Sequence, residues 1–100
     1  MKTTFSEENG KYVMRFEGRL DTSASSQTER DVKVLYECDG HDIVLDCTDL
    51  EYISSSGLRI FLGILKNSKA HGSNVSIVGL KDNLRQVFDE IGFTRLFSIL

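Results

Sequence analysis

The chain has 100 residues, the length of one small domain. Its net charge is −3, so it lacks the basic excess of a nucleic-acid-binding domain. No apolar run is long enough for a membrane span, and the first ten residues do not resemble a signal peptide. The two cysteines and two histidines are too few and too widely spaced for a metal site. We therefore expect no metal, no cofactor and a reducing, cytoplasmic location.

The N-terminal segment predicts a β-hairpin. Thr3–Ser6 indicates a weak strand, and Asn9-Gly10 is typical of a type I′ turn, which needs positive φ at both central residues. Residues 11–17 alternate apolar and polar side chains, as in a strand with one buried face.

Residues 18–21 are expected to leave this strand and lead into a first helix that runs to about Glu37. The segment is polar, so this helix is the weakest of the predicted elements. Its candidate N-cap residues are Asp21, Thr22 and Ser23.

Two continuous apolar runs, 43–47 and 75–78, predict neighbouring central strands of a parallel sheet. Between them, the apolar spacing of residues 55–70 predicts a helix that ends before Gly72. A third helix is predicted over 82–91, and residues 96–100 could add a short last strand.

This order of elements predicts a single α/β domain over residues 1–100. Strands that alternate with helices form right-handed crossovers and pair in parallel. We therefore expect a mixed, mostly parallel β-sheet with an N-terminal β-hairpin and three helices packed on it.

Three consecutive serines, Ser54, Ser55 and Ser56, stand at the predicted start of the second helix, directly before Gly57. One reading is helix capping, because serine is among the best N-cap residues. One serine suffices for that, and Gly57 is a poor helix former. A second reading is phosphorylation, because a phosphate at a helix N-terminus gains backbone N–H contacts.

A hydrolytic nucleophile is a third reading of the triplet, but the sequence argues against it. The triplet lacks the G-x-S-x-G pattern. The candidate bases are His41, before the central strand, and His71, at the far end of the helix about 24 Å away. We therefore expect no enzyme activity.

The second helix is apolar over a wider arc than one buried stripe requires. Ile60 and Ile64 fall outside that stripe, on a flank with Gly57. Either neighbouring helices cover this flank, or it forms a docking patch that begins at the serines and extends to Asn67. The stripe itself consists of Leu58, Phe61, Leu62 and Leu65.

Other polar residues carry weaker signals. Asp46 and Asp49 could suggest Mg²⁺ ligands, although paired carboxylates are common at strand ends. Arg19 and Arg59 could steer a phosphate or be solvated surface charges. Cys47 is expected to be a small buried hydrophobic residue.

The chain resembles the STAS domain and, within it, the bacterial anti-sigma factor antagonists. Residues 16–22 (FEGRLDT) are similar to the family's G-x-L-D motif. Residues 43–58, which end in ISSSGL, resemble its central strand and D-S-S/T-G-L switch loop. Residues 84–93 resemble its late helix and the glycine that follows. The family's final helix is expected to be absent from residues 1–100.

The resemblance implies a non-enzymatic regulator. In its unphosphorylated form it would bind an anti-sigma factor with serine kinase activity and so release a sigma factor. The kinase would phosphorylate Ser55, with Ser54 and Ser56 as alternates, and a PP2C-type phosphatase would reverse this. Separately from the resemblance, the expected absence of the final helix would expose surface and so favour a weak homodimer. The expected partner-binding residues are Asp21, Thr22, Ser54, Ser56, Gly57, Arg59, Ile60, Ile64 and Asn67.

An alternative function remains open, because Ser54 stands where the family usually has Asp. The chain could be a STAS module that binds without switching. Such a module would serve, for example, as a small subunit of a lipid-trafficking ABC transporter or as part of a signalling complex.

Overall fold

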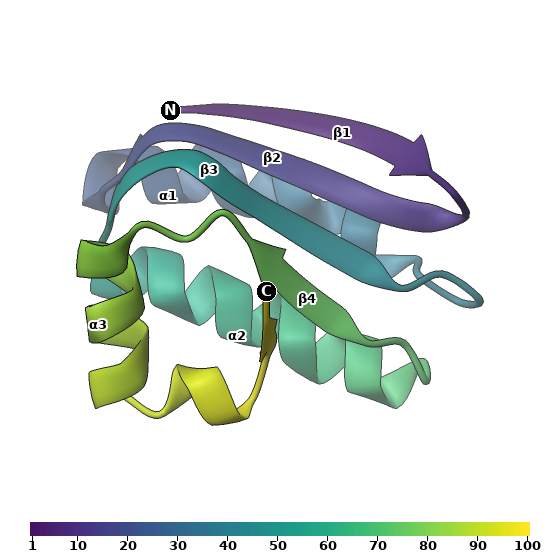
Figure 1. Cartoon of the computed structure of the whole chain (residues 1–100). Coiled ribbons are helices and arrows are strands. Elements are labelled where there is room, and N and C mark those ends of the chain that lie inside the picture. The colour runs from purple at the N-terminus through teal and green to yellow at the C-terminus, as the bar shows by residue number, and fades with distance from the viewer.

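The computed structural model describes residues 1–100. The elements in chain order are β1 (Lys2–Glu8), β2 (Lys11–Leu20), α1 (Thr22–Asp31), the 3₁₀ helix η1 (Val32–Tyr36), β3 (Ile43–Ile53), α2 (Ser55–Ala70), β4 (Val75–Val78), α3 (Asp82–Glu90), the 3₁₀ helix η2 (Phe93–Arg95) and β5 (Ser98–Ile99). The strands form one sheet in the order β1-β2-β3-β4-β5, with β1 antiparallel to β2 and the other pairs parallel. Helices α1 and α2 lie side by side on the same side of the sheet (Figure 1). The predicted fold class is confirmed. No helix has both the length and the apolar character needed to cross a membrane.

The hairpin forms at the predicted dipeptide. Asn9 has φ 53° and Gly10 has φ 77°, the left-handed conformation that a type I′ turn requires. The pairing runs from Glu8 opposite Lys11 to Lys2 opposite Glu17. The turn residues therefore set the register of the first two strands.

Aromatic side chains join the sheet to the helices. The ring of Phe16 on β2 lies 5.1 Å from that of Phe61 on α2, and the Phe61 ring lies 6.1 Å from that of Phe88 on α3. Phe93 and Phe97 continue the series. Phe16, Phe61 and Phe88 are fully buried, so this row forms the centre of the core.

Strands β2 and β3 are longer than predicted. β2 continues through Gly18 to Leu20, and β3 continues to Ile53, with register shifts between them. At such bulges one strand carries an extra residue, which breaks the two-residue alternation that marks a strand in a sequence. The buried residues of β3 are Ile43, Leu45, Cys47, Leu50 and Ile53, so their spacing changes from two to three after Cys47.

The first helix is shorter than predicted. α1 ends at Asp31, and the chain continues as a 3₁₀ helix over Val32–Tyr36. Val32 and Leu35 are both fully buried there. A 3₁₀ helix has three residues per turn, which places these two side chains on the same side.

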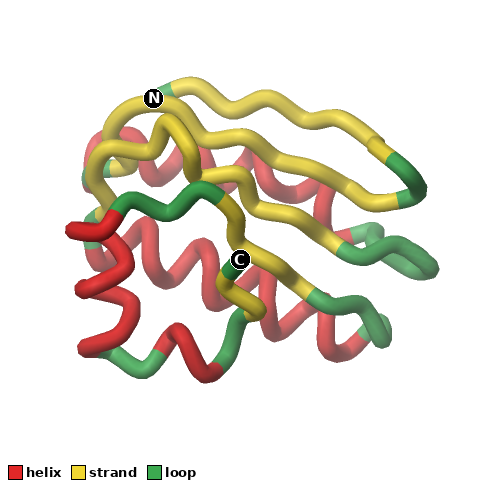
Figure 2. Tube along the Cα trace, in the orientation of Figure 1, coloured by secondary structure: helices red, strands yellow, loops and turns green.

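At one end of the sheet, β2 and β3 lead directly into helices α1 and α2, whereas loops gather at the opposite end (Figure 2). The backbone N–H of Ser54 donates a 2.8 Å hydrogen bond to the carbonyl of Leu20. A Cβ at Gly57 would lie 2.8 Å from side-chain atoms of both Leu20 and Ile53. The glycine therefore has a packing role, because it lets the start of α2 press against the two strand ends.

We expect Gly57→Ala to lower the free energy of unfolding by about 1–3 kcal/mol, because the methyl group overpacks a buried contact. Gly63→Ala in the same helix is the control. Its Cβ would meet only the Tyr36 hydroxyl, at 2.9 Å, which is the far end of a side chain. We expect its effect to stay within about 0.5 kcal/mol, since alanine also favours the helix. Urea unfolding followed by circular dichroism measures both, and equal effects would contradict this account.

Candidate functional site

The N-termini of α1 and α2 meet at the end of β2 and β3, and each has a side-chain cap. Asp21 Oδ1 accepts hydrogen bonds from the Ala24 N–H (3.0 Å) and the Ser23 hydroxyl (2.8 Å). The Ser23 hydroxyl and then the Ala24 N–H lower the pKa of Asp21 below its usual value. Ser54 Oγ accepts from the Gly57 N–H at 3.2 Å and caps α2. The capping reading of the triplet is thus confirmed for Ser54.

A chain of hydroxyl groups links the two helices. Ser54 Oγ lies 2.9 Å from Ser56 Oγ, which lies 2.7 Å from Ser25 Oγ on α1. Ser25 donates its only proton to the carbonyl of Asp21, at 3.0 Å. Ser25 must then accept from Ser56, and Ser56 must accept from Ser54. Each of these three serine hydroxyls therefore donates its one proton to the next group, in the order Ser54, Ser56, Ser25 and the Asp21 carbonyl.

Ser55 stands apart from this chain. It is the first residue of α2, it is exposed, and its hydroxyl has no hydrogen-bond partner within the protein. Ser54 is only 8% exposed, and Ser56 is half-buried. Of the three serines, only Ser55 presents an accessible and uncommitted hydroxyl.

We expect Ser56→Ala and Ser25→Ala each to lower the free energy of unfolding by about 1 kcal/mol, because each breaks the hydroxyl chain. The double variant is expected to lose less than the sum of the two, since both changes remove the same hydrogen bond. Ser55→Ala is the matched control and is expected to change stability by less than about 0.5 kcal/mol. Thermal and urea unfolding measure all four variants, and strict additivity would contradict the coupling.

A groove of about 360 Å³ adjoins the hydroxyl chain. Burial and the nearby Glu29 carboxylate raise the pKa of Tyr36 in this groove. The groove is lined by Ser25, Glu29, Tyr36, Ser56, Arg59, Ile60 and Gly63. The residues that α1 and η1 contribute were missed from the sequence, because no local pattern indicates which helix packs against α2.

The predicted apolar flank of α2 is not exposed. Ile64 is fully buried and Ile60 is only 6% exposed, because α1 and η1 pack against α2. Asn67 donates a 2.9 Å hydrogen bond to the carbonyl of Tyr36 at the end of η1. The prediction of a continuous docking patch along this flank is therefore wrong. The alternative prediction, that neighbouring helices cover the flank, is correct. Thr22 and Arg59 are exposed near the serines.

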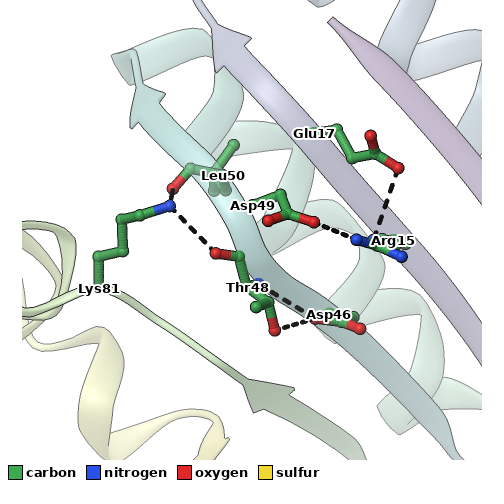
Figure 3. Close-up of polar contacts among 7 residues, drawn as sticks. All are labelled: Arg15, Glu17, Asp46, Thr48, Asp49, Leu50 and Lys81. Atoms are coloured by element: carbon green, nitrogen blue, oxygen red, sulfur yellow. Dashed lines mark hydrogen bonds and ion pairs between the residues drawn. The ribbon is translucent and has the colours of Figure 1, made fainter.

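Further polar residues lie on β2 and β3 (Figure 3). Arg15 pairs with Asp49 and lies 3.5 Å from Glu17. The hydrogen bond from Arg15 lowers the pKa of Asp49 below its usual value. Asp46 instead accepts from the backbone N–H and hydroxyl of Thr48, at 3.0 and 2.7 Å. The two aspartates therefore have separate protein partners, and no group of three or more potential metal ligands forms.

Lys81 covers the part of β3 that extends beyond β4. Its Nζ donates to the carbonyl oxygens of Thr48 and Leu50, at 3.0 and 3.4 Å. β4 ends at Val78, opposite Asp46, and offers these carbonyls no strand partner. The ammonium group thus takes the place of the missing backbone donors.

Neither histidine is near the serines. His41 stacks on Tyr12, 4.3 Å between ring centroids, and its Nδ1 lies 2.8 Å from the carbonyl of Gly10 at the hairpin turn. His71 pairs with Asp39 beyond the end of α2. Cys47 is buried as expected, and burial raises its pKa to about 12. The serine cluster therefore has neither a histidine nor an activated thiol beside it.

The site thus belongs to a small α/β domain in which the exposed Ser55 hydroxyl, at the N-terminus of α2, has no hydrogen-bond partner. The STAS domain model matches residues 2–100, so the chain belongs to the STAS domain family. BtrV of Bordetella bronchiseptica, by name a candidate anti-sigma factor antagonist, is 28% identical over 99 residues, which cover 99% of this chain and 85% of BtrV.

Solved structures share the fold. A candidate anti-sigma factor antagonist from Thermotoga maritima has a TM-score of 0.88 at 17% identity, covering 97% of this chain and 84% of that one. The Bacillus cell fate determinant SpoIIAA in its phosphorylated form has a TM-score of 0.75 at 19% identity, covering 99% and 91%.

Proposed function

We propose that this chain is an anti-sigma factor antagonist that works as a phospho-switch. Unphosphorylated, it binds an anti-sigma factor that is also a serine kinase, and this binding frees a sigma factor in the cytoplasm. The kinase modifies Ser55 and ends the complex, and a PP2C-type phosphatase removes the phosphate. The chain itself has no catalytic role in this cycle.

The observation that carries the proposal is the isolation of Ser55. A kinase must bring the hydroxyl close to the γ-phosphate of ATP, which requires an accessible and uncommitted side chain. Ser54 and Ser56 are committed to the cap and to the hydroxyl chain, whereas Ser55 is exposed and free. The resemblance of the switch loop independently favours the same residue.

A phosphate on Ser55 changes the surface rather than the fold. It adds about −1.5 to −2 charges at the N-terminus of α2, where the helix dipole and free N–H groups stabilise an anion. A partner surface that is apolar or acidic would then be repelled. In this proposal the partner contacts the exposed or half-buried residues around Ser55, namely Asp21, Thr22, Ser56 and Arg59.

We expect an anti-sigma factor with serine kinase activity from the same organism, given ATP, to add one phosphate per chain, on Ser55. Ser54→Ala and Ser56→Ala should remain substrates, and Ser55→Ala should not be modified. The phosphorylated chain should bind the kinase at least about 10-fold more weakly, because like charges facing each other across an interface cost more than the roughly 1.4 kcal/mol that a tenfold change requires. Mass spectrometry maps the site, and calorimetry measures the affinity.

The result that contradicts the proposal is a kinase that neither binds the chain nor modifies any of the three serines. Ser54 in place of an acidic residue motivates the second candidate, a STAS module that binds without switching. Binding to the ATPase subunit of an ABC transporter, with no phosphorylation, would favour that function.

A further inference from the structure

Arg59 is an exposed cation next to Ser55 with no ionic partner. The ion pairs of the structure involve Arg15 and His71, and none includes Arg59. Arg59 lines the groove between α1 and α2 as its single basic residue, with Glu29 as its single acidic residue. The two do not form an ion pair. The guanidinium is therefore available to another anion.

The spacing of Arg59 and Ser55 places the two residues on the same face of α2. Both residues lie in α2, four positions apart. Residues at i and i+4 occupy the same face of a helix, about 6 Å apart at Cβ, and long side chains lean toward the N-terminus. An acidic group N-terminal to a basic one is the favourable order for such a pair.

The other arginine near this end of the sheet is already engaged. The Arg19 guanidinium lies over the ring of Tyr52, 4.4 Å from its centroid. If the Arg19 guanidinium moved to a phosphate, this cation–π contact would be lost. Arg59 requires no such exchange.

We propose that Arg59 binds the phosphate of phosphoserine 55, an assignment that rests on the proposed function. A guanidinium matches phosphate oxygens with two parallel N–H donors. The pair would also neutralise the one positive charge that lines the groove, so that Glu29 would remain as the only other charged residue there. Phosphorylation would then alter the surface in two places, adding negative charge at the end of the helix and removing positive charge from the groove.

The test uses the full chain with phosphoserine incorporated directly at position 55 by codon suppression, so that no kinase is needed. The second pKa of the phosphate is measured by ³¹P NMR titration at low salt. A nearby cation favours the dianion, so Arg59→Gln should raise this pKa by about 0.3 unit. Arg59→Lys should retain part of the effect, and roughly 0.5 M NaCl should reduce the difference.

Lys66→Gln is the matched control, because Lys66 is an exposed cation of α2 too far along the helix to reach the phosphate. It should leave the phosphate pKa unchanged. A second readout is the Arg59 Nε–H resonance, which should move with the phosphate titration in the phosphorylated chain only.

Equal phosphate pKa values in the parent chain and in Arg59→Gln, with a static Arg59 resonance, would overturn the inference. Because the phosphate is installed without a kinase, that result says nothing against kinase recognition. Conversely, a chain that no kinase modifies would contradict the proposed function while leaving the measured pairing intact.

Discussion

The close contact of α2 with the ends of β2 and β3 is the constraint on which the site depends. Gly57 has no side chain, so the first turn of α2 lies directly against Leu20 and Ile53. The Ser54 N–H bonds to the carbonyl of Leu20, which ties the helix start to β2. With this turn held in place, Ser54 faces inward as the cap and Ser55 faces solvent. The exposure of the Ser55 hydroxyl thus depends on the close packing of Gly57 against the two strand ends.

The hydroxyl chain also makes the three serines of the triplet differ in their hydrogen bonds. The sequence does not distinguish the three adjacent serines, yet the structure gives each different contacts. Ser54 caps the helix, Ser56 joins α2 to Ser25 of α1, and Ser55 makes neither contact. A hydroxyl donates only one proton, so each committed donor becomes a poorer target for modification.

Where a local rule governs the backbone, the sequence was sufficient. Asn9-Gly10 predicted the hairpin, and the apolar spacing of 55–70 predicted α2 with its observed bounds. Where long-range pairing governs it, the sequence was not sufficient. The bulges in β3 change the spacing of buried residues, so Leu50 and Ile53 did not look like strand residues. η1 was read as a continuation of α1, because a 3₁₀ turn has no separate local signature.

The sequence by itself determined the fold class, the family resemblance and the position of the serine triplet at the start of a helix. Periodicity and turn residues act over a few positions and are therefore visible in the chain. Only the tertiary structure decided which serine is free, that Ile60 and Ile64 are covered, and that α1 completes a groove beside Arg59. These features depend on which surfaces of distant segments meet, and burial and hydrogen-bond partners exist only once those segments have packed together.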